Sequence, residues 1–346
     1  MTTWLALLLA DHSPILRTLV LRELLGRPAD DPEVAELAAL RESDPLVAEL
    51  LSLQQPDGSW HAGDLAWRLP ASPLRATAQA LMRLGYLGFD ANHPAVRRGA
   101  EHLFSLQRAD GAWPLPAEDG ESETQREGYS MIPLQTALPL QALALGGYAA
   151  DARAERAYEW LLAQRLPDGA WPTGVAAGNF GRVAGYRRLA HSRWGCRSNT
   201  TGALICLAHH PQRRHGPEAR RALDLLLGRE TRERHTLGFE AARLIGVEPM
   251  RGFLTRYARF DLALVLDLCR RIGATPADAR VGELIRFVCE AQGPYGLWEY
   301  LPHPQASRWV TFDLLRSLSR LDEGGEWVSL EPRTPFRAYP RPLRRH

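Results

Sequence analysis

The sequence has 346 residues, of which 45% are hydrophobic and 24% charged, the balance of a globular protein with a sizeable core. Its formal net charge of +2 argues against nucleic acid as a partner, whereas peripheral contact with a membrane stays open. All 42 basic residues are arginine, which excludes chemistry that needs a Schiff-base lysine or a P-loop lysine. The N-terminus lacks the pattern of a secretory leader and the four cysteines are scattered, so we expect free thiols and a cytoplasmic location.

A short motif recurs along the chain: an apolar helical segment, a glutamine, a turn that usually reads Asp-Gly, and a tryptophan. The copies end at Trp60, Trp113, Trp171 and Trp298. These tryptophans are 53, 58 and 127 residues apart, and because the last spacing is about two periods, a degenerate copy without the turn is expected over 221–229. Such a period predicts an array of helical units that stack against one another.

Each copy of the motif is typical of a helix end. Its apolar residues recur at helical spacing, and Asp-Gly supplies the left-handed turn that ends the helix. The glutamine amide can bond main-chain groups there while the tryptophan packs against the adjacent helix, so we interpret both residues as structural. The helices that carry the motif are predicted at 44–54, 93–107, 152–164, 217–229 and 278–291.

A second set of helices follows the turns and shares one frame. A polar residue at a ring position i is followed by an aliphatic residue at i+4 and by leucine at i+7, which lie on one helical face. The ring positions are Thr77, Thr136, Thr200, Asp261 and Thr311, with Arg17 in the N-terminal unit. This alternation predicts an all-α fold, an α/α toroid of about six inner and five to six outer helices, in one domain over 1–322. A basic, Pro/Arg-rich tail is expected over 323–346.

The glutamine–tryptophan motifs resemble the repeats of squalene-hopene cyclases, oxidosqualene cyclases and related terpenoid cyclases, whose toroid is shared by protein prenyltransferase β subunits. The resemblance extends over about 14–321 and is to short, single-toroid bacterial members. It implies a central cavity that accepts an isoprenoid or another elongated apolar molecule, and the isomerase or lyase chemistry of a cyclase. The D-x-D-D stretch with which class II cyclases protonate an alkene is missing, as is the D-D-x-x-D stretch of class I synthases.

Asp261 is the best single candidate for a catalytic acid or base. It replaces threonine at the ring position of the fifth unit, next to where the resemblance places the acid of D-x-D-D. Protonating an alkene requires a neutral carboxyl group in a dry pocket, and a lone aspartate lacks the neighbouring carboxylates that would tune it. The alternative is an N-cap aspartate that bonds backbone amides or pairs with Arg259.

Arginine and aromatic side chains gather around the ring positions. Guanidinium groups beside helix N-termini suit a diphosphate or a carboxylate, and aromatic rings could line the same mouth. The alternative is that the arginines cap helices or bridge to acids on loops. The predicted ligand-binding residues are Arg17, Arg75, Arg197, Arg259, Arg308, Trp194, Tyr257, Phe260 and Trp309.

A metal site is not expected, although prenyltransferase β subunits hold zinc in their toroid. The candidate ligands are Cys196, Cys206, His209, His210 and Asp261. Cys196 and Cys206 would lie about 15 Å apart along one helix, and Cys206 with His209 supplies only two of the three ligands that a catalytic zinc needs. No cofactor is expected, and Mg²⁺ enters only if the substrate is a diphosphate.

Two classes of function therefore stay open. In the first, the chain is a cyclase-like enzyme with an open, aromatic-lined cavity that leads to Asp261. In the second, it is a noncatalytic toroid, filled with leucine, that binds a lipid or a protein partner. Aliphatic residues at i+4 and i+7 favour a filled barrel, whereas the aromatic residues near the ring positions favour an open mouth. The oligomeric state stays open as well.

Overall fold

The structure is a computed structural model of the whole chain. It describes residues 2–61, 72–113, 132–174, 183, 185–228, 235–249, 256–293 and 295–321. Statements about the structure refer to these residues, and the predicted tail over 323–346 lies outside them. Apart from two strands of two residues each, the regular structure of this part of the chain is helical.

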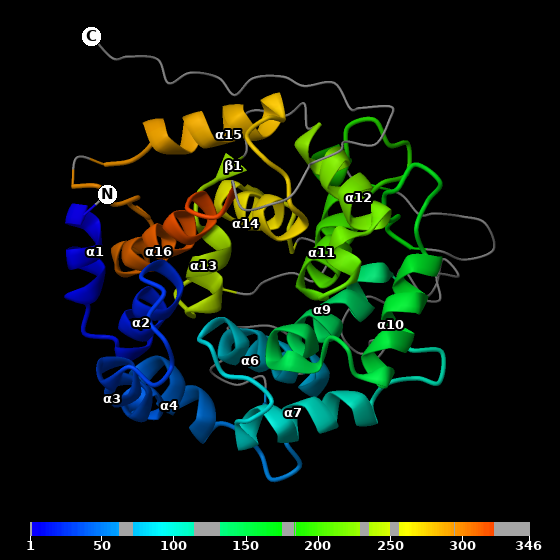
Figure 1. Cartoon of the computed structure of the whole chain (residues 1–346). Coiled ribbons are helices and arrows are strands. Elements are labelled where there is room, and N and C mark those ends of the chain that lie inside the picture. The colour runs from blue at the N-terminus through cyan, green and yellow to red at the C-terminus, as the bar shows by residue number, and fades with distance from the viewer. Residues whose placement is uncertain are drawn as a thin grey trace.

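The helices form two concentric layers, as the sequence predicts for an α/α toroid (Figure 1). All six inner helices of the predicted frame are present. They are α2 (Pro14–Leu19) with its continuation η1 (Val20–Leu24), α6 (Pro73–Tyr86), α9 (Pro133–Leu143) with its continuation η4 (Ala144–Tyr148), α11 (Arg197–His209), α14 (Leu262–Ile272) and α16 (Ser307–Leu318). Successive inner helices pack against one another from α6 to α16, and α16 contacts η1, so the first and last units lie side by side.

The outer layer carries the glutamine–tryptophan motif. Its helices are α1 (Thr2–Leu9), α3 (Pro32–Leu40), α4 (Pro45–Ser52), α7 (Pro94–Ser105), α10 (Ala152–Ala163), α12 (Pro217–Leu227) and α15 (Ala279–Glu290). The five predicted outer helices are thus confirmed to within a few residues at each end. Four of them begin where a side chain accepts a backbone N–H as N-cap, namely at Asp44, His93, Asp151 and Asp278.

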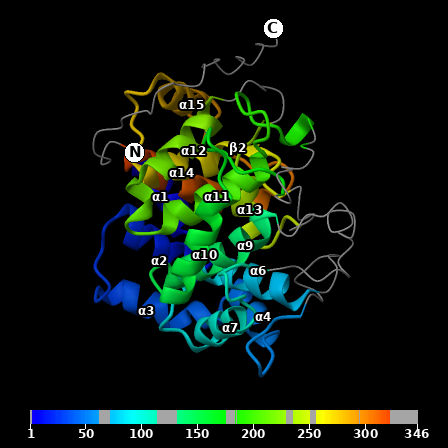
Figure 2. The same ribbon diagram turned by 90° about the vertical axis from the view of Figure 1, so that its right-hand side faces the viewer.

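Short elements complete the described part of the chain. Single turns of 3₁₀-helix are η2 (Arg41–Ser43), η5 (Gly185–Arg187), η6 (Arg213–His215) and η7 (Pro304–Ala306). Strands β1 (His235–Thr236) and β2 (Phe260–Asp261) pair in parallel, with His235 opposite Phe260. Along the chain, α13 (Phe239–Leu244) lies between the two strands. Seen edge-on, the ring has α13 and β2 displaced toward one face (Figure 2).

The glutamine–tryptophan turn makes the same hydrogen bonds in every copy. The indole Nε1 of Trp60, Trp113, Trp171 and Trp298 donates to the carbonyl ten residues earlier, in the outer helix, at 2.7 Å each time. The backbone N–H of the same tryptophan donates to the ring threonine of the next inner helix, for example to Thr77 Oγ1 at 3.0 Å. Each turn therefore fastens the end of an outer helix to the start of an inner one, and the four tryptophans are fully buried.

The glutamines have the predicted main-chain role in three copies. The side-chain amides of Gln54, Gln107 and Gln292 donate to the carbonyl of the turn glycine four residues later. Gln54 and Gln107 also donate to a carbonyl in the first turn of the next outer helix, at 2.9 Å. These residues are therefore explained by the fold, without a ligand.

Removing a ring hydroxyl is expected to weaken the ring locally. Thr136 is fully buried, and its Oγ1 accepts the N–H of Trp113 at 3.2 Å. Thr136→Val keeps the shape but leaves this amide without an acceptor, so we expect a loss of about 1–3 kcal/mol in unfolding free energy, measured by denaturant titration. Thr136→Ser, which keeps the hydroxyl, should lose clearly less, and an equal loss in both variants would contradict this role.

The degenerate fifth unit replaces the turn with an inserted segment. α12 carries the degenerate copy, and Arg229, which stands where the glutamine would be, lies outside the described residues. In place of the turn, β1, α13 and β2 lead into α14, and α13 packs against α6 and α16 on the inner side of the ring (Figure 1). The inserted segment brings buried charged side chains into the toroid, among them Glu240 and Arg243 of α13.

Candidate functional site

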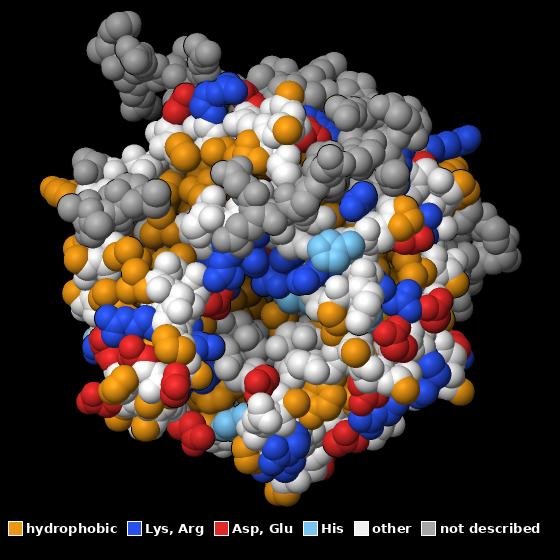
Figure 3. All heavy atoms as spheres, in the orientation of Figure 1, with side chains coloured by type: hydrophobic (Ala, Val, Ile, Leu, Met, Phe, Trp, Pro, Cys, Tyr) orange, Lys and Arg blue, Asp and Glu red, His pale blue; other side chains and the backbone are white. Residues whose placement is uncertain are grey.

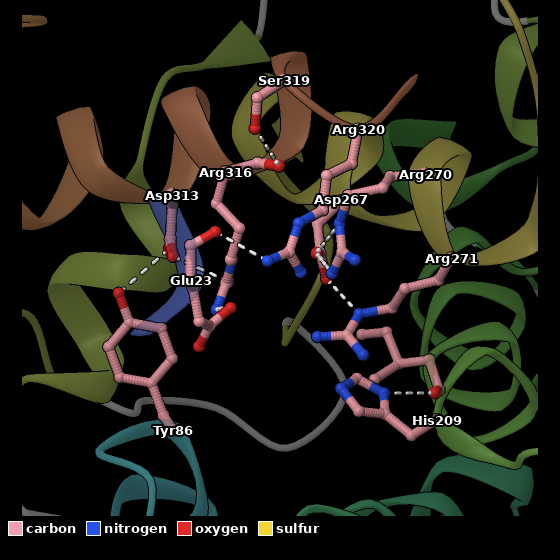
Figure 4. A network of polar contacts seen from close by, with 11 residues as sticks. Glu23, Tyr86, His209, Asp267, Arg270, Arg271, Asp313, Arg316, Ser319 and Arg320 are labelled. Carbon is pink, nitrogen blue, oxygen red and sulfur yellow. Dashed lines mark hydrogen bonds and ion pairs between the residues drawn. The ribbon is translucent and has the colours of Figure 1, made fainter. Parts of the chain in front are cut away.

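A hollow opens at the centre of the face that is shown in space-filling form, and basic side chains gather on its rim (Figure 3). The close view shows a network of polar side chains that come from the inner helices and the residues directly after them (Figure 4). We call them the mouth cluster: Glu23, Tyr86, His209, Asp267, Arg270, Arg271, Asp313, Arg316 and Arg320.

The repeat frame explains why residues so far apart in sequence meet here. Tyr86, His209, Arg270 and Arg320 each lie nine residues after the ring position of their own unit, and Glu23 and Asp267 lie six residues after theirs. Because the inner helices run in the same direction, these positions reach the same mouth. The ring positions and the residues before them do not predict this cluster, because most of its members lie six or nine residues further along the inner helices.

Asp267 is the anionic centre of one half of the cluster. Arg270 donates to its Oδ1 at 2.7 Å from Nη2, and Arg271 donates to its Oδ2 at 2.6 Å from Nε. Burial alone would raise the pKa of Asp267, but the charges of Arg271 and Arg270 hold it well below its usual range. Asp267 is therefore a carboxylate at neutral pH.

Asp313 is the carboxyl group of the other half. Tyr86 donates its hydroxyl to Asp313 Oδ2 at 3.0 Å, and Arg316 Nη2 donates to Oδ1 at 2.8 Å. Burial raises the pKa of Asp313 to about 6, against the opposing effect of Arg316. Arg316 also lies 3.5 Å from Glu23, whose backbone carbonyl accepts a hydrogen bond from Arg320.

Arg271, like Arg320, uses only one of its donor nitrogens within the described residues. Only its Nε is used, on Asp267, and within the described residues its two Nη atoms make no hydrogen bond. In the close view these atoms point toward the space beside His209 (Figure 4). Burial lowers the pKa of Arg271, with Arg270 and Arg316 adding to the shift, so its charge is only partly compensated.

His209 adds no charge to the cluster. Its Nδ1 bonds the Ile205 carbonyl at 2.8 Å, and burial together with Arg271 lowers its pKa to about 3. The imidazole is neutral at physiological pH. Four arginines therefore face three carboxylates, an excess of one positive charge on the rim.

The interior of the toroid is also charged. Arg243 Nη1 donates to Glu240 at 3.1 Å, and Arg256 lies 3.7 Å from the same carboxylate. Tyr257 donates its hydroxyl to Gln141 Oε1 at 2.6 Å. All five side chains are buried. Neither of the two expected interiors, filled with leucine or lined mainly by aromatic rings, describes this part of the toroid.

Asp261 caps α14 and holds the inserted segment. Its Oδ1 accepts the N–H groups of Gly238 and Ala263 at 2.8 and 3.1 Å, and its Oδ2 accepts that of Glu240 at 2.6 Å. Burial raises the pKa of Asp261 to about 6, although the amide hydrogen bonds oppose the shift. These contacts correspond to the N-cap alternative, and the catalytic role stays a prediction.

The five arginines predicted near the ring positions each have contacts within the protein, and their role in ligand binding stays a prediction. Arg308 pairs with Asp11 at 2.8 Å and Arg17 with Glu33 at 3.7 Å. The others occupy separate surroundings: Arg197 donates to the Ala258 carbonyl, Arg259 lies over the Phe239 ring, and Arg75 lines a narrow gap between α6 and α9.

The four predicted aromatic residues differ in their exposure. Trp194 is 37% exposed, whereas Tyr257, Phe260 and Trp309 are buried. Trp309 reaches the mouth cluster, since its ring centre lies 5.9 Å from that of Tyr86. A role for any of them in ligand binding stays a prediction.

The candidate zinc ligands lie apart. The Cys206 thiol donates to the Ala137 carbonyl, His210 pairs with Glu155 at 2.7 Å, and Cys196 is the N-cap residue of α11. In the described ranges no three His, Cys, Asp or Glu side chains are grouped so that they could hold a metal ion.

No described helix has both the length and the apolar composition of a membrane-spanning segment.

The same repeats are found in known proteins. Residues 35–186 match the family model of the squalene-hopene cyclase C-terminal domain. Over these residues, which are less than half of the chain, the protein is similar to that family. A stretch of 116 residues is 30% identical to lanosterol synthase of Candida albicans; it covers 33% of this chain and only 15% of the length of that protein.

Two solved structures align with most of these cyclase-like repeats. One is a protein from Actinoplanes, with 16% identity over 89% of this chain and 90% of that chain and a TM-score of 0.44. The other is a type II terpene cyclase from Scytonema, with 15% identity over 81% of this chain and 97% of that chain and a TM-score of 0.33.

Proposed function

We propose that this cyclase-like toroid binds an isoprenoid-class molecule with an anionic head group, and that the mouth cluster holds the head. The observation that carries the proposal is Arg271, whose two Nη atoms have no hydrogen-bond partner within the described residues and point toward the space beside His209. The cyclase-like repeats over 35–186 support an isoprenoid as the apolar body.

Electrostatics at the mouth favour an anion of small size. The last turns of the inner helices present carbonyl oxygens with partial negative charge, which some of the arginines offset, as Arg320 does at the Glu23 carbonyl. Arg271 is not used in this way. A phosphate or carboxylate oxygen that accepts from both Nη atoms would compensate a charge that burial now penalises.

An apolar pocket lies beside the mouth cluster and could hold part of the body. It has a volume of about 370 Å³, within the range of small-molecule sites, and Ile15, Leu19 and Val34 are among its lining residues. Glu23 belongs to both this pocket and the mouth cluster. We place part of the apolar body in this pocket, between α2 and α3.

The test is a comparison of two ligands that differ only in the head group. We expect farnesyl diphosphate to bind and farnesol to bind much more weakly in titration calorimetry. Arg271→Gln should weaken binding of the diphosphate about tenfold to a hundredfold, which corresponds to one or two lost charge-assisted hydrogen bonds. Arg286→Gln is the matched control, because Arg286 is an exposed arginine on α15 that pairs with Glu283.

Equal binding of farnesol and farnesyl diphosphate, or an unchanged affinity in Arg271→Gln, would refute the proposed role of the mouth cluster. Binding of squalene in preference to the diphosphate would do so too, because squalene has no anionic head.

Catalysis is proposed on the resemblance, with Asp261 as the predicted acid or base. A product assay by mass spectrometry with squalene and with farnesyl and geranylgeranyl diphosphates, each with and without Mg²⁺, tests it. Cyclised product that is lost in a folded Asp261→Asn variant supports a cyclase. Product that survives in Asp261→Asn but is lost in Asp313→Asn assigns the acid to the mouth cluster. Tight binding without turnover supports the alternative, a noncatalytic binding protein.

A further inference from the structure

A second pocket lies at the opposite end of α6 from the mouth cluster. Its volume is about 710 Å³, and it is bounded by the first glutamine–tryptophan turn, the start of α6 and the end of α7. α6 has 14 residues, so about 20 Å of helix separates this pocket from Tyr86 at the mouth. The two sites do not share a residue.

An oriented imidazole belongs to this pocket. His102 Nδ1 lies 3.6 Å from Asp57 Oδ2, and Asp57 is itself held by the N–H and the hydroxyl of Ser59, at 3.0 and 2.7 Å. Those hydrogen bonds lower the pKa of Asp57, which keeps the carboxylate charged beside the imidazole. His102 Nε2, on the far side of the ring, is buried and has no hydrogen-bond partner within the described residues.

A hydroxyl group at the start of α6 is likewise unused. Ser72 is 2% exposed, and its Oγ makes no hydrogen bond within the described residues. Although Ser72 is the N-cap residue of α6, it does not cap the helix. Pro73 follows it and has no N–H, so the first backbone donor of α6 is Leu74, which also lines the pocket. Among the described residues, α6 has neither a side-chain cap nor an acidic residue in its first turn to compensate the positive end of its dipole.

We propose that this pocket binds the carboxylate of a small organic acid. The carboxylate accepts hydrogen bonds from the Ser72 hydroxyl and from an N–H at His102 Nε2, next to the N-terminus of α6. Leu74 and Leu106, which line the pocket, receive the apolar body of the acid. A bound carboxylate would give Ser72 Oγ and His102 Nε2 the hydrogen-bond partners that they lack within the described residues. Buried donors and acceptors without a partner are rare in native proteins.

The experiment uses the full chain with labelled histidine rings, followed by NMR during titration with benzoate. The His102 signal is assigned by its loss in His102→Gln. Benzoate is expected to shift it saturably, and benzyl alcohol, which has the same ring without the charge, is not. Ser72→Ala should weaken benzoate binding about fivefold to tenfold, the effect of one lost hydrogen bond. Ser52→Ala, an exposed serine in α4, is the matched control.

Several outcomes would overturn the proposal: no saturable shift of His102, equal shifts with benzyl alcohol, or unchanged affinity in Ser72→Ala. Inorganic phosphate that binds as tightly as benzoate would assign the pocket to a simple anion instead of an organic acid. Circular dichroism of each variant separates a lost site from a lost fold. Because the site is independent of the mouth cluster, Arg271→Gln should leave benzoate binding unchanged, whichever way the test of the proposed function falls.

Discussion

Replacing Asp261 with alanine is expected to lower the unfolding free energy by about 3–5 kcal/mol. The side chain is 4% exposed and accepts three backbone N–H groups, two of which belong to the inserted segment of the fifth unit. Alanine leaves all three donors buried without an acceptor. Asp261→Asn should cost less, about 1–3 kcal/mol, because one amide oxygen can still serve Gly238 and Ala263 while the NH₂ group faces the Glu240 donor. Denaturant titration of the wild type and of both variants measures these differences in unfolding free energy.

The pH dependence of the same series tests the buried carboxyl group. Burial raises the pKa of Asp261 to about 6, above its value in the unfolded chain. The folded state therefore binds the proton more tightly, and the stability that Asp261 contributes falls as the pH rises through the folded pKa. We expect the advantage of the wild type over Asp261→Asn to shrink by about 1 kcal/mol between pH 5 and pH 7. An advantage that grows over this interval would mean that the amide hydrogen bonds outweigh burial.

The two roles considered for Asp261 give different results in this series. A residue that acts only as an acid can be changed to asparagine without loss of stability. The N-cap role predicts that stability falls in Asp261→Asn whether or not a product is formed. Full stability in both variants would remove the structural explanation and strengthen the catalytic one.

Asp224→Ala is expected to destabilise the protein by a similar amount, about 3–5 kcal/mol. Asp224 is fully buried in α12, where Arg280 Nη1 lies 2.5 Å from its Oδ1 and Arg221 Nη1 lies 2.7 Å from its Oδ2. Arg280 belongs to α15 and also pairs with Asp278 at 2.7 Å. Without Asp224 a buried guanidinium loses its carboxylate on the α12 side, and the two outer helices lose their ionic link. Thermal and denaturant unfolding measure the loss.

A surface pair provides the control for this prediction. Glu283 and Arg286 pair on α15, but Arg286 is 58% exposed, so Glu283→Ala should cost no more than about 0.5 kcal/mol. A loss below about 1 kcal/mol in Asp224→Ala would show that Asp278 alone can hold Arg280 and that the link between the helices adds little.

The ring could be predicted from the sequence because its signals are local and repeated. Asp-Gly followed by tryptophan marks each helix end, and the ring residue with leucine seven positions later marks each inner helix. The structure also supplies a pairing that the motif alone does not show, in which Trp60 N–H bonds Thr77 Oγ1 across 17 residues. Ring threonine and motif tryptophan are thus two halves of one contact, which explains why they recur together.

The candidate sites were harder to predict because they depend on long-range contacts. Arg271 and Asp267 form a pair within one helix, but Tyr86 and Asp313 are 227 residues apart and meet only when the ring closes. The inserted segment could not be predicted from the repeat pattern for another reason. Asp261 keeps the ring position, so the frame appears intact, yet its two oxygens bond the start of α13, a helix that the repeat frame does not predict.

The hydrogen bonds of each turn have a consequence for how such rings can change in evolution. In every motif the carbonyl, the tryptophan and the ring threonine come from one continuous stretch, such as Leu50 to Thr77 or Val288 to Thr311. A whole unit can therefore be duplicated or lost together with everything that fastens its two helices to each other. Only the packing between neighbouring units must then adjust, so the number of units in a ring can vary while the geometry inside each unit is inherited unchanged.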